Sequence, residues 1–328
     1  MLGRWLAGAL LLCAFGCGEP GPAGRDQRVT AAVAGSTDEA GRFSGVVGVV
    51  TRKGDQISRC TGVLVAPKLM LTARHCVAYY EASDVVCGEA PLLESVTAED
   101  VLVTAQPTQT DTASDYVNGV EIIAAPGGDD TCGFDLAAIR LADAPPGAGS
   151  VYPPRLEGDV SPGEAFTSVG YGSDGNAGVG TRRYLEGARV ACSGESCQSE
   201  HVQPNEWQGE DGTFCEHDSG AAAIDAEGRL LGTVSRGRGP CTTPILAAMP
   251  PWKDWLIDVA LSASGTTGDP VPPWAMPTIE LPDDMRSLPT ESAPKLASTC
   301  SFSVPRSGSA AWLLLAGCLA GLCGRRRV

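Results

Sequence analysis

The chain has 328 residues, of which 43% are hydrophobic, enough for a domain with a buried core. Its formal net charge of -15 argues against nucleic acid as a partner, because that binding needs clustered Lys and Arg. Gly (41 residues) and Pro (24 residues) are abundant and aromatic residues are scarce, a balance that favours an all-β protein with many turns.

Residues 1–17 have the pattern of an export signal. Arg4 supplies a positive charge, Trp5–Phe15 is mostly apolar, and small residues precede Cys17. The apolar stretch is shorter than the ~20 residues that a membrane-spanning helix requires. The sequence Ala-Phe-Gly-Cys that ends at Cys17 resembles a bacterial lipobox. We therefore expect export and leave lipidation of Cys17 open.

Eight of the 13 cysteines lie in the middle of the chain, between the two ends. An even number within one globular stretch fits four disulfides formed in an oxidising compartment. Zinc is the alternative, but this region has no paired CxxC motif and the chain has only three histidines, so we expect no metal. The eight are Cys60, Cys76, Cys87, Cys132, Cys192, Cys197, Cys215 and Cys241.

Short apolar runs separated by Gly and Pro predict a series of strands, as in a sandwich or barrel. One helix is predicted late in the chain, because apolar residues between Trp252 and Ala260 recur at helical spacing. Pro251 lies near its start, where a missing N–H costs little. The predicted strands are 46–51, 62–66, 101–104, 120–124, 137–141, 166–169 and 230–235.

The C-terminal part changes character twice. Residues 263–299 are rich in Pro, Ser, Thr and acidic residues, which predicts an extended linker. Residues 300–328 begin with Cys300, continue with an apolar run and end near three arginines. That order fits either a short membrane anchor with its arginines inside or a tail that resembles the MYXO-CTERM sorting tails of myxobacterial surface proteins. Both interpretations place the domain outside the cytoplasm, where the tail would join it to the membrane or cell envelope. The domain would be displayed at the cell surface or released from it.

Three local patterns carry candidate catalytic residues in the order His, Asp, Ser. His75 ends Leu-Thr-Ala-Arg-His, Asp135 precedes an apolar run, and Ser219 lies in Cys-Glu-His-Asp-Ser-Gly. A serine hydroxyl is a poor nucleophile near neutral pH, so it needs a base, and the base needs a carboxylate that fixes its tautomer. Histidine suits the base role because its unperturbed pKa is about 6.5. We expect these three side chains to form a catalytic triad.

The three patterns resemble the signature blocks of chymotrypsin/trypsin-like serine peptidases. The resemblance covers roughly Ala32 to Leu261, within a domain that we place at residues 32–262. It implies two packed six-stranded antiparallel β-barrels followed by a C-terminal helix, with the triad in the cleft between the barrels. It also implies hydrolysis of a protein or peptide through an acyl-enzyme, without a cofactor. We expect a monomer.

The resemblance assigns roles to residues around the nucleophile. The N–H groups of His217 and Ser219 would form the oxyanion hole. Ser235 would bond the triad aspartate, and Ser235, Arg236 and Gly237 would form the edge that pairs with an extended substrate. Thr213 stands at the position of the pocket floor, where it offers no charge to a substrate Lys or Arg.

Asp218 corresponds to the family's buried aspartate, which pairs with the new α-amino group released by zymogen cleavage. A buried carboxylate without a partner is costly, so the site stays unformed until that amine arrives. The resemblance places the new terminus at Ala32 or Val33 and makes residues 18–31 a short propeptide. Arg28 is the nearest basic residue upstream but lies several residues too early, which leaves the activating protease open.

Two disulfides also follow from the resemblance, one holding the loop with His75 and one bracing the nucleophile loop. These are Cys60–Cys76 and Cys215–Cys241. The remaining cysteines are paired by proximity as Cys87–Cys132 and Cys192–Cys197.

The sequence departs from the family pattern near the active site. The family has glycine where His217 stands, because the backbone angles there favour a residue without Cβ. Ala221 replaces a second glycine, Arg74 replaces a small residue, and Arg236 replaces a tryptophan. Two interpretations stay open: an active peptidase, or a catalytically impaired pseudopeptidase that serves as a surface binding module.

Overall fold

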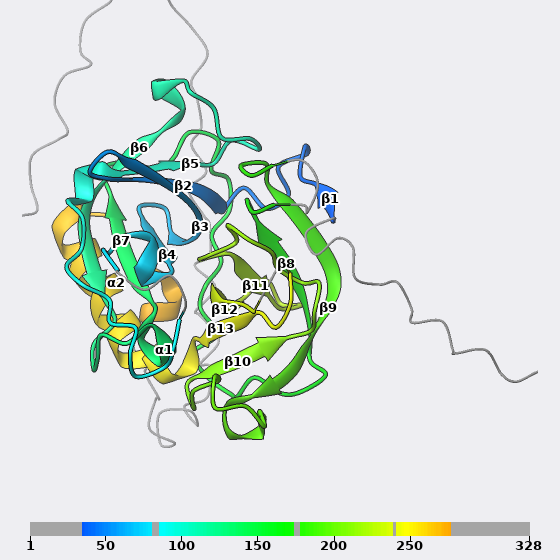
Figure 1. The fold of residues 1–328 in the computed structure, drawn as a ribbon. Coiled ribbons are helices and arrows are strands. Elements are labelled where there is room, and N and C mark those ends of the chain that lie inside the picture. The colour runs from blue at the N-terminus through cyan, green and yellow to red at the C-terminus, as the bar shows by residue number, and fades with distance from the viewer. Residues whose placement is uncertain (1–34, 81–84, 174–177, 239–240, 277–328) are drawn as a thin grey trace, which may run out of the picture. The chain divides into compact units, whose positions relative to one another are not determined.

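A computed structural model describes residues 35–80, 85–173, 178–238 and 241–276 of the chain. The expected export signal, propeptide, new terminus and C-terminal tail lie outside the described residues. Within them the chain forms two closed, six-stranded antiparallel barrels and a C-terminal helix, as the sequence predicts (Figure 1).

The first barrel uses the N-terminal half of the described chain. It closes because β2 pairs with β3 on one side and with β5 on the other. Around the barrel, the strands are β2 (Val46–Lys53), β3 (Gln56–Ala66), β4 (Leu69–Thr72), β7 (Ala137–Leu141), β6 (Val117–Ala124) and β5 (Val101–Thr104).

The second barrel follows a long connection and closes through the pairing of β8 with β9. A short strand, β1 (Ser36–Thr37), extends its sheet by pairing with β9. Around the barrel, the strands are β8 (Ala165–Gly170), β9 (Arg183–Ser193), β10 (Glu206–Gly209), β13 (Ile245–Ala248), β12 (Leu230–Arg236) and β11 (Ala222–Ile224).

Several strands read as unbroken apolar runs because both of their faces are buried. In β2, Val47 and Val49 belong to the interior of the first barrel, whereas Val46 packs in the core shared by the two barrels. In β11, Ala223 faces the interior of the second barrel and Ala222 the shared core. The period-two alternation therefore distributes one apolar run over two cores.

Helix α2 (Lys253–Thr267) follows the 3-10 turn η5 (Pro250–Trp252) and ends at Gly268, which has φ 72°. Its apolar side packs on the shared core. The folded part then continues to residue 276, beyond the boundary that we placed at 262. Trp274 donates its indole N–H to the Val65 carbonyl at 2.9 Å, and the adjacent Ala275 is buried. These apolar residues extend the domain into the Pro-rich stretch.

None of the helices in the described part is long and apolar enough to span a membrane. The tail for which we considered an anchor, residues 300–328, lies outside that part.

Candidate active site

His75 is carried by η1 (Arg74–Cys76), a single 3-10 turn that follows β4. Two contacts fix this turn. Cys76 is disulfide-bonded to Cys60 of β3, and the Lys53 ammonium donates to the His75 carbonyl at 2.6 Å. Burial lowers the pKa of Lys53 to about 8, so keeping its ammonium charged in this position costs free energy. The imidazole therefore projects from a backbone anchored on both sides.

Asp135 lies between the short helix α1 (Thr131–Phe134) and β7, and it is 2% exposed. Its Oδ1 accepts the backbone N–H of His75 at 2.8 Å, and its Oδ2 lies 2.8 Å from His75 Nδ1. The Ser235 hydroxyl also donates to Oδ2, at 2.7 Å. Burial acts to raise the pKa of Asp135, but attraction to His75 and these hydrogen bonds outweigh it and lower the pKa, which keeps the carboxylate ionised.

Ser219 completes the cluster from the second barrel. Its Oγ lies 2.9 Å from His75 Nε2. With Nδ1 donating to Asp135, Nε2 is the acceptor that faces the hydroxyl. The loop is tied to the first barrel, because Thr61 donates its N–H to the Ser219 carbonyl at 2.8 Å. Gly220 has φ 80°, and a Cβ there would lie 2.1 Å from the Thr61 carbonyl oxygen, so this contact requires glycine.

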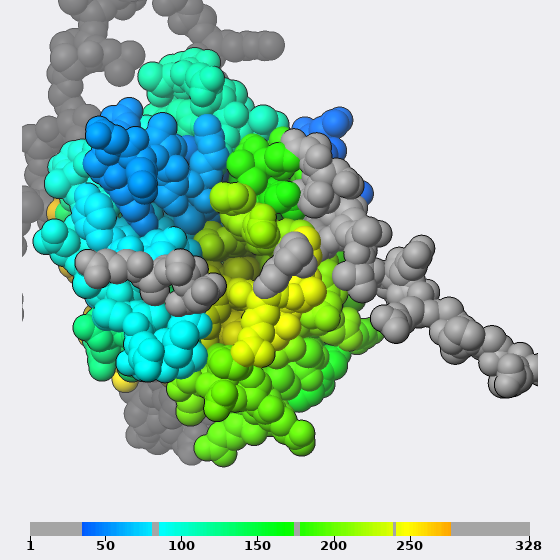
Figure 2. Space-filling model, viewed as in Figure 1, coloured from blue at the N-terminus to red at the C-terminus, as the bar shows by residue number. Residues whose placement is uncertain are grey.

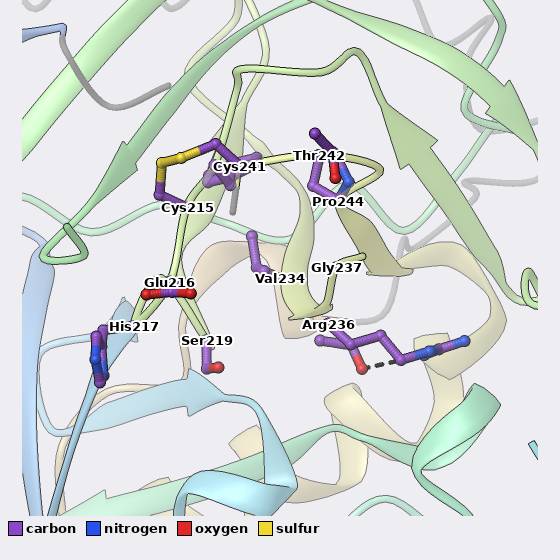
Figure 3. Close-up of a pocket in the computed structure, with 12 residues that line it drawn as sticks. Cys215, Glu216, His217, Ser219, Val234, Arg236, Gly237, Cys241, Thr242 and Pro244 are labelled. Atoms are coloured by element: carbon purple, nitrogen blue, oxygen red, sulfur yellow. Dashed lines mark hydrogen bonds between the residues drawn. A yellow bond between two sulfur atoms is a disulfide. The ribbon is translucent and has the colours of Figure 1, made fainter. Parts of the chain in front are cut away.

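Two backbone N–H groups beside Ser219 are available to an anionic oxygen. Neither the N–H of His217 nor that of Ser219 donates to an acceptor in the described part of the chain. His217 has φ 68°, in the left-handed region that costs a residue with a Cβ about 1–2 kcal/mol. Its imidazole is exposed and turned away from Ser219 (Figure 3). The backbone therefore adopts a conformation typical of glycine with a histidine in place.

Asp218, the neighbour of Ser219, is fully buried and accepts hydrogen bonds only from neutral donors. Its Oδ1 accepts the Gly172 N–H at 2.8 Å and its Oδ2 the Cys215 N–H at 2.9 Å. Among the residues that the structure describes, no cation pairs with this carboxyl. Burial raises the pKa of Asp218 to about 7, against the effect of the two hydrogen bonds. Burying a carboxyl whose only partners in the described residues are two backbone N–H groups is costly.

Comparison with known families agrees with this arrangement. The Trypsin family model matches residues 32–256, more than half of the chain. The chain belongs to the trypsin family. No curated protein matches it. Serine peptidase chemistry is the activity of this family, and the barrels, the order of the three motifs and the cluster of their side chains all fit it.

The cleft of this trypsin-family domain lies where the two barrels meet, and Figure 2 shows a hollow on that face. A pocket of about 140 Å³ opens beside Ser219. Three of the residues expected to bind substrate, Ser235, Arg236 and Gly237, line it, and Thr213 does not. Thr213 is buried, and its hydroxyl donates to the Glu210 carbonyl. Other lining residues include Phe214, Glu216, Val234, Thr242 and Pro244.

The side chain of Arg236 in this trypsin-family domain extends away from Ser219, although the residue lines the pocket (Figure 3). Its guanidinium binds both carboxylate oxygens of Glu206, at 2.6 and 2.7 Å. Glu206 was not among the residues predicted for the site. A buried arginine requires an acidic partner, but nothing in the local pattern indicates which of the many acidic residues supplies it.

A larger groove, of about 650 Å³, also opens on Ser219. It is lined by both His75 and His217 and by cationic and aromatic side chains of the first barrel. These include Lys53, Arg59, Tyr79 and Tyr80. The Tyr80 ring packs edge-on against the His75 ring, with centroids 5.9 Å apart.

The eight cysteines of the domain are joined in the four pairs expected: Cys60–Cys76, Cys87–Cys132, Cys192–Cys197 and Cys215–Cys241. Four disulfides in a trypsin-family domain fit an extracellular or secreted protein. Within the described residues, Cys60, His75 and Cys76 are spaced closely enough to hold a metal ion. The two sulfurs of this cluster are bonded to each other, so they are not thiolate ligands.

Proposed function

We propose that this chain is a serine endopeptidase that hydrolyses peptide bonds through an acyl-enzyme. His75 acts as general base, Asp135 orients it, and Ser219 is the nucleophile. The observation that carries the proposal is the 2.9 Å separation of His75 Nε2 and Ser219 Oγ, together with the 2.8 Å separation of His75 Nδ1 and Asp135 Oδ2. A base within hydrogen-bond reach and a fixed tautomer are what an activated serine needs.

In the proposed reaction, Ser219 Oγ attacks the carbonyl carbon of the peptide bond while its proton passes to His75 Nε2. The negative charge that develops on the carbonyl oxygen is stabilised by the N–H groups of His217 and Ser219. The imidazolium then protonates the leaving amine, and an ester of Ser219 remains. Water attacks this ester with His75 again taking the proton, and the acid product leaves.

The substrate would lie as an extended strand along the edge formed by Ser235, Arg236 and Gly237. Its side chain at the cleaved bond would enter the pocket of about 140 Å³. Thr213 is uncharged and lies outside the lining, and the acidic residue of the lining, Glu216, is exposed to solvent, so a substrate Lys or Arg would lose hydration without a buried compensating charge. We therefore expect cleavage after uncharged side chains of small or medium size.

We further propose that the chain is made as a zymogen. The buried Asp218 carboxyl, with its raised pKa, is a site for the α-amino group of Ala32 or Val33 after removal of the residues that precede it. When this amine docks, it stabilises the carboxylate and the pKa of Asp218 falls. Because cleavage removes Cys17, only the C-terminal tail at 300–328 could then hold the mature enzyme at the cell surface.

Labelling with a fluorophosphonate probe tests the function. The probe should modify Ser219 in the protein recovered from the secreted fraction, and the Ser219→Ala variant should stay unlabelled. Intact-mass analysis of the same sample locates the processed ends. If protein with the expected new terminus fails to react where a reference serine peptidase does, the peptidase proposal is wrong.

The second candidate is a pseudopeptidase that serves as a binding module. It is favoured by His217, a residue with a Cβ at φ 68° in the proposed oxyanion hole. His217→Gly distinguishes the two, because a missing oxyanion donor costs about 10²–10³-fold in rate. A labelling rate that rises by this factor in His217→Gly favours the pseudopeptidase, and an unchanged rate favours the active enzyme.

A further inference from the structure

A buried ion pair lies beneath the proposed substrate edge. Arg236 in β12 and Glu206 in β10 form two parallel hydrogen bonds, and their side chains are only 10% and 2% exposed. A bidentate arginine–carboxylate pair fixes distance and orientation together. Burying two charges is costly, and a hydrophobic pair of similar size would often be as stable, so stability alone does not account for it.

The pair holds the segment that immediately precedes Asp135. Glu206 Oε1 accepts the backbone N–H of Gly133 at 2.7 Å, and the Arg236 guanidinium lies 3.4 Å from the Thr131 carbonyl oxygen. The neighbouring Asn205 amide donates to the Gly133 carbonyl at 2.5 Å. Two strands of the second barrel thus hold α1 of the first barrel, whose last residue adjoins Asp135.

The same guanidinium also reaches Asp135 through one side chain. Arg236 Nη1 donates to Ser235 Oγ at 3.2 Å, a bond drawn in Figure 3, and Ser235 Oγ donates to Asp135 Oδ2 at 2.7 Å. Because the arginine occupies an acceptor position of the hydroxyl, the hydroxyl proton is directed at the carboxylate. A cation at the far end of such a chain strengthens the next bond.

We propose that Arg236 and Glu206 are positioning residues of the catalytic centre, which set the orientation of Asp135, and through it of His75, by two routes. One route is the backbone of α1 and the other is the Ser235 hydroxyl. The proposal deepens the peptidase function proposed above and rests on it for its kinetic readout. Neither residue touches the reacting atoms.

The test replaces both charges at once, which leaves no unpaired ion: Arg236→Met combined with Glu206→Gln. The matched control, Arg155→Met with Glu164→Gln, removes an ion pair in the connection that leads into β8, and this pair makes no hydrogen bond to the triad. The readout is the rate at which a fluorophosphonate labels Ser219 in the processed full chain, measured against pH. We expect a fall of roughly 10- to 100-fold in the first variant and no comparable change in the control.

The shape of the pH curve separates positioning from general loss of structure. When the hydrogen bond from Ser235 weakens, more negative charge stays on Asp135. This charge favours the protonated form of His75 and raises its pKa. The labelling rate should therefore begin to fall at a higher pH on the acidic side of the curve. If folding fails in the double variant, Arg236→Lys replaces it, since lysine keeps the charge but not the two-pronged geometry. If the variant is labelled at the wild-type rate and the acidic side of its pH curve does not shift, the proposal is wrong.

A second readout needs no catalysis. The low-field proton NMR signal of His75 Nδ1–H reports its bond to Asp135 even in a protein that does not react with the probe. We expect this signal to broaden or disappear in the Arg236/Glu206 variant and to persist in the Arg155/Glu164 control. If wild type fails to label but the signal depends on the pair, the peptidase function is wrong and the positioning role stands. If the signal is the same in both variants, the positioning role is wrong.

Discussion

At the scale of single residues, burial of the Asp218 carboxylate carries a large electrostatic cost. Its carboxyl is fully buried, has only backbone N–H partners among the described residues, and has its pKa raised to about 7. A folded-state pKa above the unfolded value means that the folded chain binds a proton that the unfolded chain releases between about pH 4 and 7. Stability from this group is therefore present at low pH and is lost as pH rises through that window.

This yields a test on the unprocessed chain. Between about pH 4 and 7, the wild-type free energy of unfolding should fall, relative to Asp218→Asn, by at most about 4 kcal/mol. Urea unfolding at several pH values, in a Ser219→Ala background that prevents self-cleavage, measures the difference. Other carboxyl groups titrate equally in both proteins, so they cancel. If the unfolding free energies of the two proteins change in parallel with pH, Asp218 does not have a raised pKa in the folded chain.

At the scale of elements, the C-terminal segment is more than a linker. Helix α2 (Lys253–Thr267) and the indole of Trp274, bonded to the Val65 carbonyl, both cover the shared core. A chain that ends after Met276 should keep this packing, whereas one that ends after Ser262 cuts the helix and removes Trp274.

We expect the chain that ends after Ser262 to lose roughly 3 kcal/mol or more of unfolding free energy relative to the chain that ends after Met276, because it exposes one large aromatic side chain and part of α2. Urea unfolding of both chains in the Ser219→Ala background measures this. Equal midpoints would place the domain boundary at 262, as the composition alone predicts.

The disulfides offer a second test between elements. Cys215–Cys241 joins the nucleophile loop to the wall of the pocket, whereas Cys192–Cys197 closes a short loop at the end of β9. Replacing the first pair by serines should lower the fluorophosphonate labelling rate by about tenfold or more, since it frees the loop that places Ser219. The same change at the second pair is the control and should leave the rate nearly unchanged. Equal effects would contradict this role.

All seven predicted strand ranges fall on strands of the described chain, but six of its strands, β1, β4, β9, β10, β11 and β13, were not predicted. The predicted ranges 101–104 and 137–141 coincide with β5 and β7. β9 (Arg183–Ser193) and β10 (Glu206–Gly209) were not predicted, because they carry charged or glycine residues and are stabilised by pairing with strands distant in the chain. Strand preference depends on such neighbours, which a local pattern does not contain.

For the site, the order of three motifs and the family resemblance led to the side chains that the structure brings together, and their catalytic roles stay predictions. The local sequence pattern did not correctly predict two other features of the site. Thr213 was expected at the pocket floor but is turned into a backbone hydrogen bond. Glu206 was not expected at all, since its contact with Arg236 spans 30 positions of the chain.

At the scale of the whole molecule, the two barrels share one core. Leu71 of the first barrel is fully buried in the same cluster as Ile224 and Leu230 of the second. A residue in such a position contributes to the packing of both halves, so we expect the barrels to unfold together.

Leu71→Ala should lower the free energy of unfolding by about 2–5 kcal/mol. Fluorescence of Trp207, inside the second barrel, and amide exchange in β2 and β3 of the first barrel should report the same transition. Two separate transitions, with only the first barrel affected, would show that the halves are independent. The conservative variant Leu71→Met, which keeps the volume, is the control.

The division of the triad between the barrels also has a consequence for the timing of biosynthesis. His75 and Asp135 emerge from the ribosome early, but the hydroxyl that they would activate lies much later in the chain, in the loop between β10 and β11, and the Thr61–Ser219 contact needs both barrels. In a partly synthesised chain, His75 is therefore present without the Ser219 hydroxyl that it would deprotonate. If the chain has the proposed activity, the cell that makes it is not exposed to that activity until the second barrel has been synthesised and folded.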